Sequence, residues 1–295
     1  MRSGLNWCAV KLAEWYLPTC LNFADLTLAT SPQLKDQLKE LGCRNVEVWR
    51  KGIDTDVFSS KFNESNIEMR SIMTDGQPTR PLLLYVGRLG REKNINMIKD
   101  VLQRIPQARL AVVGAGPAEE ELKEHFQGTD TVFMGLMSGE ALSRAYAAAD
   151  VFVMPSESET LGFVVLEAMA SEVPAVGAAA GGIPNLVQDG VNGFLFRPGD
   201  VDDLTLKVRK LISDTRLRQK MGQMARAETL KWNWQSATSV LRNLQYTRAE
   251  RNFEGRQRQW QSSLLRPANW LSWCMRPLMP ATLVKTSPNA TAFDV

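Results

Sequence analysis

Two glutamates, Glu159 and Glu167, stand with seven residues between them in segment 156–187, and Glu167 lies inside an otherwise apolar stretch that is expected to be a helix. A strand expected at 151–155 ends just before them, and we expect the next helix to begin near Thr160. The amides of a first helical turn have no partner within the helix and lie at the positive end of its dipole, so they can bind a phosphate group. The amides available for this would be those of Thr160, Leu161, Gly162 and Phe163.

The two carboxylates would then bind groups on either side of that phosphate. On a helix that starts at Thr160, Glu167 shares a face with Thr160 and Val164 and could bind the two hydroxyls of a ribose. Glu159 precedes the helix and could bind the hydroxyls of a second sugar. One ligand with a sugar, a diphosphate and a ribose in series explains both acids. The alternative is structural, with Glu159 favouring the helix N-terminus and Glu167 extending to solvent.

Cationic side chains follow another expected strand, at 82–87. Arg88 and Lys93 lie in this loop beside Gly87 and Gly90. Arginine is a bidentate donor to phosphate, and glycine lets backbone amides approach a ligand closely. A solvated charged turn is equally compatible with this stretch taken alone.

Two further motifs carry less weight. Gly114 and Gly116 lack the full G-x-G-x-x-G pattern, which favours a tight turn between a strand and a helix over a nucleotide loop. Asp54 and Asp56 could hold a divalent ion, but no other carboxylate is evidently positioned with them. We therefore expect no metal site.

The elements that must position these residues alternate regularly from residue 81 onward. Short β-branched runs joined by helical patterns indicate an α/β fold with a doubly wound parallel sheet. Ligands bind such sheets at the carboxyl ends of the strands, where the loops discussed above are expected. Ser31 and Asp200 are expected N-caps of helices, and C-terminal helices are expected at 215–230 and 234–255.

Composition narrows the classes of function. The chain has 295 residues, of which 44% are hydrophobic and 23% charged, enough for a sizeable core and for more than one globular unit. A net charge of +3 does not indicate a nucleic-acid partner. The four cysteines form no Cys-x-x-Cys pair, which argues against a zinc cluster or a disulfide framework. No apolar run approaches the roughly 20 residues of a spanning helix, and no secretory or transit segment is visible.

Several motifs occur together and in order: the Glu159 and Glu167 pair, GRLGREKN at 87–94, ADVFVMPSESETLG at 149–162 and GGIP at 181–184. In this combination the chain resembles the nucleotide-binding half of the retaining GT-B glycosyltransferases of family four. The resemblance implies a Rossmann-like domain that forms the C-terminal half of a GT-B fold, followed by C-terminal helices. It also implies transfer of a sugar from a UDP-sugar.

The resemblance assigns roles to the charged residues. Arg88 and Lys93 would hold the diphosphate and assist its departure. Glu159 would bind the donor sugar and Glu167 the ribose. The family needs no metal, and no cofactor is expected beyond the UDP-sugar substrate.

It also assigns roles to backbone segments. The amides from Thr160 to Val164 would bind the phosphates, and the segment around Met134 and Gly135 would contact uracil. The expected donor site therefore draws on loops after several strands, and we expect Glu159 and Glu167 to border one cavity with the two cations of the 87–94 loop.

More narrowly, VGRLGREK, MPSESETLGFVVLEAMAS and WNWQSATSVLRNLQY resemble the sulfolipid synthases of plants and cyanobacteria. These enzymes transfer sulfoquinovose from UDP-sulfoquinovose to diacylglycerol. The resemblance implies a lipid acceptor or membrane surface as partner, and a peripheral plastid location at the chloroplast envelope. A donor such as UDP-glucose or another hexose, and a non-catalytic or truncated nucleotide-sugar-binding module, are the alternatives.

Four regions are expected along the chain. Residues 1–58 would be a remnant of the acceptor-side N-terminal domain, most of which is missing and is itself a candidate partner. Residues 59–80 would be a connector, 81–232 the Rossmann-like domain, and 233–295 C-terminal helices and a tail.

The chain is expected to depart from the family pattern in three respects. The first domain, which usually supplies a catalytic-site histidine, is almost absent, and the sole histidine, His125, is expected on the surface of a helix in the other half. Glu172 replaces the glycine that commonly ends the helix, at a cost of about 1 kcal/mol if its backbone is left-handed. Ala179 stands where sulfolipid synthases tend to carry an arginine, which bears on the identity of the donor.

The tail at 260–280 mixes aromatic and basic residues. Such a helix could lie on an anionic bilayer or pack against the missing domain, and both alternatives stay open. The residues concerned are Trp260, Arg266, Trp270, Trp273 and Arg276.

Overall fold

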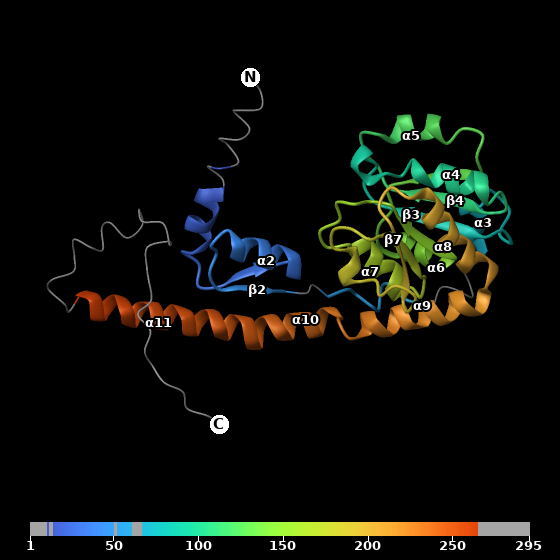
Figure 1. The fold of residues 1–295 in the computed structure, drawn as a ribbon. Helices are drawn as coiled ribbons and strands as arrows, with labels where there is room; N and C mark the ends of the chain where they lie inside the picture. The colour runs from blue at the N-terminus through green and yellow to red at the C-terminus, as the bar shows by residue number, and fades with distance from the viewer. Residues whose placement is uncertain (1–10, 12–13, 50–51, 61–66, 265–295) are drawn as a thin grey trace, which may run out of the picture. The chain divides into compact units, whose positions relative to one another are not determined.

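The fold is taken from a computed structural model, which describes residues 11, 14–49, 52–60 and 67–264. The chain divides into two compact units. The larger comprises residues 29–35 and 48–242, and the smaller comprises 1–28, 36–47 and 243–295 as far as they are described. Each unit is treated by itself below (Figure 1).

A six-stranded parallel sheet forms the centre of the larger unit, in the order β5-β4-β3-β6-β7-β8. Every residue of its four inner strands is buried, because helices cover both faces. The doubly wound parallel sheet expected from the sequence is thus confirmed. In chain order the strands are β3 (Leu82–Val86), β4 (Arg109–Val113), β5 (Thr131–Gly135), β6 (Val151–Met154), β7 (Ala175–Ala178) and β8 (Gly193–Phe196).

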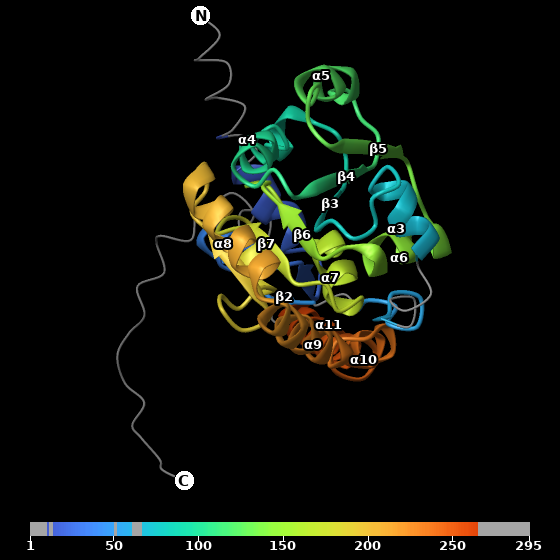
Figure 2. The same cartoon turned by 90° about the vertical axis from the view of Figure 1, so that its right-hand side faces the viewer.

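Helices lie on both sides of this sheet. Helices α4 and α8 lie on one face, whereas α3, α6 and α7 lie on the other, with α9 packed on α7 (Figure 2). The helices of this unit are α3 (Ile67–Met73), α4 (Met97–Arg104), α5 (Glu119–His125), α6 (Gly139–Ala148), α7 (Phe163–Ala170), α8 (Val201–Ser213), α9 (Thr215–Leu230) and α10 (Trp234–Val240), with short 3₁₀ turns η2 (Arg91–Lys93) and η3 (Ile183–Asn185).

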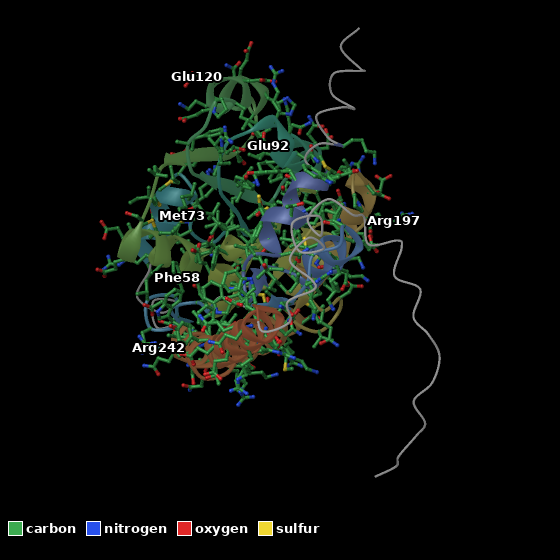
Figure 3. All side chains as sticks on the ribbon, turned by 90° about the vertical axis from the view of Figure 1, so that its left-hand side faces the viewer. Phe58, Met73, Glu92, Glu120, Arg197 and Arg242 are labelled. Carbon is green, nitrogen blue, oxygen red and sulfur yellow. The ribbon has the colours of Figure 1, made fainter. Side chains whose placement is uncertain are left out.

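The core lies between the sheet and these helices. Its largest fully buried side chains include Tyr85, Tyr146 and Phe152. Met73 is also fully buried, whereas charged side chains such as Glu120 point outward (Figure 3).

The stretch 59–80, expected to be a connector, contains helix α3 and contributes to the core. Arg70 of α3 donates to Asp150 at 2.6 Å and to the backbone oxygens of Pro78, Arg80 and Ala148. The connector prediction is wrong for this helix. The half-buried guanidinium of Arg70 donates to several carbonyl oxygens at once and so stabilises a helix whose sequence is polar. The other boundaries of the four expected regions stay predictions.

The predicted N-caps are present. The Leu34 amide donates to Ser31 Oγ at 3.1 Å, and the Asp203 amide donates to the Asp200 carboxylate at 2.9 Å. Glu172 has φ of 61°, so its backbone is left-handed, as was considered for this position where relatives commonly have glycine. Its carboxylate accepts a hydrogen bond from Ser60 Oγ at 2.7 Å.

Two distant segments of the larger unit cross beside Ile53. The Ile53 amide donates to the Trp232 oxygen, and the Trp234 amide donates to the Ile53 oxygen, each at 3.2 Å. A Cβ atom on Gly52 would lie 2.5 Å from the Asn233 oxygen and from the backbone of Trp234. Glycine is therefore required at this crossing.

The C-terminal helical region is less uniform than the single helix expected at 234–255. Helix α10 runs into a π-helical turn, η4 (Leu241–Tyr246), before α11 (Thr247–Leu264). No helix among the described residues is long and apolar enough to cross a bilayer. Of the aromatic and basic tail, Trp260 is exposed in α11, and Arg266, Trp270, Trp273 and Arg276 lie outside the described residues.

The smaller unit holds α11 and parts of three short elements near the N-terminal end of the described chain. Arg256 of α11 pairs with Asp25 at 2.8 Å, and Arg248 pairs with Glu47. These elements are β1 (Thr27–Ala29), α2 (Pro32–Glu40) and β2 (Val46–Val48), and β1 pairs with β2.

Candidate functional site

The loops that leave the carboxyl ends of neighbouring strands touch one another through their backbones. The Gly87 amide after β3 donates to Val113 of β4 at 3.0 Å, and the Gly114 amide after β4 donates to Gly135 of β5 at 2.8 Å. These contacts bring the loops after three strands to one edge of the sheet, as its parallel topology requires.

Glycines make this close approach possible. A Cβ atom on Gly114 would lie 1.9 Å from the Gly87 oxygen, and one on Gly116 would lie 2.3 Å from the Leu89 oxygen. The two glycines of the 112–122 stretch are thus explained by contact between loops. The tight turn expected from the sequence agrees with this.

The Gly181-Gly182 turn serves the loop that follows β6. The Gly182 amide donates to the Glu159 oxygen at 2.6 Å. Gly181 has φ of 58°, and a Cβ atom on it would lie 2.5 Å from the same oxygen. Two bare glycines stand here because the loop that carries Glu159 rests directly on their backbone.

Helix α7 begins later than the sequence indicated. Gly162 is its N-cap, with a left-handed φ of 61°, and the first helical residue is Phe163. The expected start near Thr160 is therefore wrong, since a left-handed residue interrupts the helical backbone. Thr160 and Leu161 belong to the loop, whereas Phe163 and Val164 form the first turn. The amides of Val165 and Leu166 donate to the Gly162 oxygen.

Lys93 and Glu159 form an ion pair across the ends of β3 and β6. Their side chains are only 17% and 16% exposed, so water screens the pair weakly. The neighbouring Asn94 donates to Glu157 at 3.3 Å, which joins the same two loops. The structure thus brings together the cation predicted to bind the diphosphate and the acid predicted to bind the sugar.

Arg88 lies in the same loop but extends outward. Its side chain is 68% exposed, and its guanidinium is 3.9 Å from Glu92. Its backbone oxygen accepts a hydrogen bond from the hydroxyl of Tyr85 at 3.1 Å. Tyr85 is fully buried, and burial, with Glu159 and Glu92 nearby, raises the pKa of its hydroxyl. The buried tyrosine therefore holds the backbone of the loop that carries both cations.

Glu167 accepts a hydrogen bond from Tyr146 Oη at 2.8 Å. Tyr146, on α6, is fully buried, and its ring packs edge-on against Phe58 and beside Phe152. Burial raises the pKa of Glu167, and the hydrogen bond from Tyr146 opposes that rise. Burial, with the charge of Glu167, raises the pKa of Tyr146. A half-buried carboxylate with a neutral donor is suited to bind hydroxyl groups.

The two predicted carboxylates lie in one electrostatic neighbourhood. The charge of Glu159 raises the pKa of Tyr85, and Tyr85 in turn raises the pKa of Tyr146. The Tyr146 hydroxyl donates its hydrogen bond to Glu167. Sequence reasoning missed both tyrosines. The signal for Tyr146 was a single large side chain among alanines in the stretch SRAYAAAD.

Met134 and Gly135 end β5, on the far side of β4 from β3. Met134 is partly buried against the core, and Gly135 has a left-handed φ of 70°. The segment predicted to contact uracil thus ends at the same edge of the sheet as the other loops.

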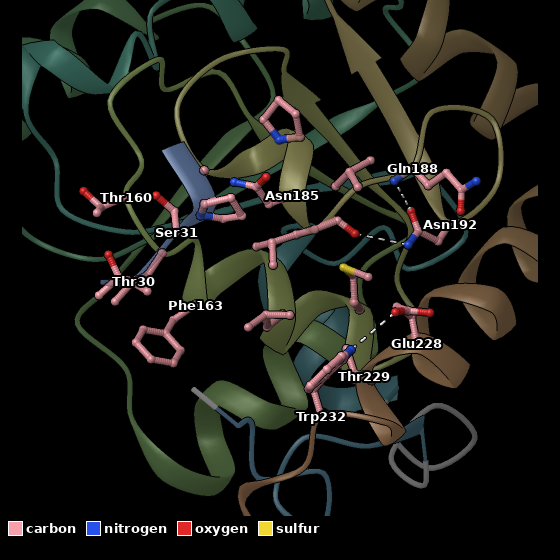
Figure 4. Close-up of a pocket in the computed structure, with 18 of the residues that line it drawn as sticks. Thr30, Ser31, Thr160, Phe163, Asn185, Gln188, Asn192, Glu228, Thr229 and Trp232 are labelled. Atoms are coloured by element: carbon pink, nitrogen blue, oxygen red, sulfur yellow. Dashed lines mark hydrogen bonds between the residues drawn. The ribbon is translucent and has the colours of Figure 1, made fainter. Parts of the chain in front are cut away.

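A cavity of about 380 Å³ lies beside these loops in the larger unit (Figure 4). Thr160, Leu161 and Phe163 line it, but Arg88, Lys93, Glu159 and Glu167 are not among its lining residues. The expectation that those four side chains border one cavity is not met by this one.

Asp54 and His125, for which the sequence predicted no role in a metal or catalytic site, make local contacts in the structure. The Asp54 carboxylate accepts the amides of Asp56 and Val57, each at 3.0 Å, and so stabilises a turn. His125 is exposed at the end of α5, as expected, with Nε2 3.3 Å from the Asn96 oxygen. The absence of a metal stays a prediction.

Comparison with known proteins identifies the family. Residues 74–228, more than half of the chain, match the family described as glycosyl transferases group 1. The chain belongs to this family. Sulfoquinovosyl transferase SQD2 of Arabidopsis thaliana is 44% identical to this group 1 member over 254 residues, which cover 84% of this chain and 49% of that protein.

Other relatives of this group 1 member differ in their donors. The GDP-mannose-dependent alpha-(1-6)-phosphatidylinositol monomannoside mannosyltransferase of Mycolicibacterium smegmatis is 33% identical, covering 83% of this chain and 68% of that one. The structure of Anabaena HepE in complex with UDP-glucose has a TM-score of 0.67 and 25% identity, covering 80% of this chain and 67% of that one. The chain spans about half the length of the first two curated relatives that it matches. The Rossmann-like half of the GT-B fold is therefore confirmed.

Proposed function

We propose that this chain is the donor-binding half of a retaining glycosyltransferase that transfers a sugar from a UDP-sugar to a lipid such as diacylglycerol. The observation that carries the proposal is the 44% identity to a sulfoquinovosyl transferase over 84% of the chain. This identity favours sulfoquinovose as the sugar, and the bound UDP-glucose of HepE supports a uridine nucleotide.

The positions of the charged residues support this function. Lys93 contacts Glu159, so a ligand that presents its diphosphate to the ammonium would present the adjacent sugar to the carboxylate. Arg88 is exposed on the same loop and can add a second cation for the diphosphate. Glu167 follows on α7, held by Tyr146, and would bind the ribose hydroxyls.

The proposed reaction breaks the bond between the anomeric carbon and the β-phosphate oxygen of UDP. The acceptor hydroxyl oxygen forms the new bond on the same side, and its proton passes to the departing phosphate oxygen. Lys93 and Arg88, with the N-terminus of α7, would stabilise the negative charge that develops on UDP. No metal is assigned a role in this scheme.

Binding of UDP to the 295-residue chain tests the donor assignment. We expect UDP to bind in calorimetry, GDP to bind more weakly, and Glu167→Ala to weaken UDP binding by about fivefold, the loss of roughly one hydrogen bond. Leu206→Ala, an exposed change on α8, is the matched control. Equal UDP affinity in Glu167→Ala would remove the ribose role.

A second candidate function is a nucleotide-sugar-binding module that needs another chain for turnover. The observation in its favour is that the side chains proposed to bind the donor, Lys93, Glu159 and Glu167, all lie within the larger unit. Release of UDP from UDP-sulfoquinovose in the presence of diacylglycerol separates the two candidates. Turnover by the isolated chain would exclude the binding-only function, and turnover with UDP-glucose instead would correct the donor.

A further inference from the structure

Segment 54–60 of the larger unit lies against the helix that carries Tyr146. The hydroxyl of Ser143, which is fully buried on α6, donates to the Val57 oxygen at 2.5 Å. One helical turn later, the ring of Tyr146 meets the ring of Phe58 edge-on, with ring centroids 5.8 Å apart and ring planes at 80°. The segment therefore contacts α6 at two points on one face of the helix.

The same segment is bound to the C-terminal end of α7, the helix that carries the proposed ribose carboxylate. Arg226 of α9 donates to the Phe58 oxygen at 3.3 Å and also to the oxygen of Ala170, the last residue of α7. Just beyond α7, Glu172 accepts the hydrogen bond from Ser60 Oγ. The segment is thus linked to both α6 and α7, which pack side by side (Figure 2).

The hydrogen bond from Tyr146 to Glu167 crosses between these two helices. Its length is 2.8 Å, and a hydrogen bond weakens steeply when its donor turns away from the acceptor. Two aromatic rings contact Tyr146, and such pairs favour a defined ring orientation. Phe152 is fully buried on β6, whereas Phe58 is half-buried and lies outside the sheet. A substitution can therefore remove the Phe58 ring without opening the centre of the sheet.

We propose that Phe58 is a positioning residue for ribose recognition: its ring fixes the Tyr146 side chain, which in turn fixes the Glu167 carboxylate toward the ribose hydroxyls of the donor. The proposal rests on the proposed function, which assigns the ribose to Glu167. It adds a residue that acts through Tyr146, and it makes nucleotide affinity depend on segment 54–60.

Two nucleotides titrated into the full 295-residue protein test this role. One is UDP, and the other is a UDP analogue that lacks both ribose hydroxyls, with calorimetric detection for wild type and Phe58→Leu. We expect Phe58→Leu to weaken UDP binding by about fivefold, the loss of roughly one hydrogen bond, and to leave the affinity for the analogue unchanged. Equal weakening of both nucleotides would mean that the ring only fills space, and would overturn the proposal.

Two matched variants separate positioning from a general loss of packing. Phe194→Leu removes a buried ring on the edge strand β8, and Phe58→Tyr keeps the ring at the proposed position. Both should bind the two nucleotides as wild type does. If Phe194→Leu reproduced the effect of Phe58→Leu, the effect would not be specific to this ring and the proposal would be wrong.

A double-mutant cycle shows whether Phe58 acts through Tyr146. Tyr146→Phe removes the hydrogen bond to Glu167, so adding Phe58→Leu should not lower the UDP affinity further relative to the analogue. Two residues that acted independently would instead give effects that multiply, and that result would contradict the proposal.

The titration of Glu167 provides a test that needs no nucleotide. The hydrogen bond from Tyr146 opposes the rise of the Glu167 pKa. In NMR of protein labelled at its glutamate carboxyl carbons, this pKa should be higher in Phe58→Leu than in wild type, and unchanged in Phe194→Leu.

The two kinds of measurement distinguish the failure of each proposal. If UDP does not bind the wild type, the donor assignment fails, and the Glu167 titration alone decides whether Phe58 positions the carboxylate. If UDP binds but the Glu167 pKa is the same in Phe58→Leu and wild type, the positioning role fails and the donor assignment stands.

Discussion

At the scale of single residues, Glu167 is a carboxylate that folding makes harder to ionise. Burial raises its pKa in the folded protein. The folded state therefore holds this proton more tightly than the unfolded state, and the contribution of Glu167 to the free energy of unfolding falls as pH rises from the ordinary glutamate value through the raised one. A functional carboxylate in this place lowers stability at neutral pH.

Replacing this acid with its amide should reveal that effect. Glu167→Gln keeps an acceptor for Tyr146 and removes the charge, so we expect a higher free energy of unfolding than wild type at pH 7 and a smaller difference at pH 4. Urea unfolding at the two pH values measures it. A variant less stable than wild type at both values would contradict the assignment.

The hydrogen bond from Tyr146 opposes the raised pKa of Glu167 and fixes its carboxylate. Tyr146→Phe should weaken UDP binding by about fivefold, and the loss of affinity on acidification should begin at a higher pH than in wild type. The effect should vanish for a UDP analogue that lacks both ribose hydroxyls. A purely structural tyrosine would weaken both ligands alike and leave the pH profile unchanged.

The ion pair of Lys93 and Glu159 calls for a double-mutant cycle. Each single change, Lys93→Met or Glu159→Gln, leaves a poorly exposed polar partner alone and should cost about 2 kcal/mol or more. The double variant should cost less than the sum of the two. Chemical unfolding of the four proteins measures the coupling energy, and simple additivity would show that the pair contributes nothing.

At the scale of elements, the double-glycine turn determines where the loop with Glu159 lies. Gly181 and Gly190 both have left-handed backbones, but only a Cβ atom on Gly181 would meet backbone atoms. Gly181→Ala should therefore cost about 2 kcal/mol more than Gly190→Ala, which bears only the conformational penalty of about 1 kcal/mol. Thermal unfolding of both variants checks the difference. Equal losses would mean that the loop can shift freely.

The elements themselves were largely predictable, because their signals are local. Continuous apolar runs identified strands such as β3 and β6, and Ser31 and Asp200 identified two helix starts. The start of α7 was misplaced because nothing local reveals that Gly162 is left-handed. Helix α3 was missed because it depends on Arg70, whose partners lie up to 80 residues away. Tyr146 could not be paired with Glu167 without the packing of α6 on α7.

At the scale of the molecule, the crossing at Ile53 joins segments about 180 residues apart in the chain. Gly52→Ala should lower the free energy of unfolding by about 3 kcal/mol, because the added methyl group meets the backbone of Asn233 and Trp234. Gly255→Ala, where no atom lies within 4 Å, should be neutral or stabilising. Differential scanning calorimetry compares the two. Similar melting temperatures would show that the crossing yields to the added group.

The loops at the carboxyl edge of the sheet approach one another closely at glycine backbones. A saturation library of this chain should accordingly show a sharp division. Glycines at 114, 116, 181 and 182 should accept almost no replacement, whereas exposed positions between them, such as Ala179, should accept many. With the loop backbones fixed in this way, related proteins can change the sugar or base that they bind by replacing only the exposed side chains of these loops.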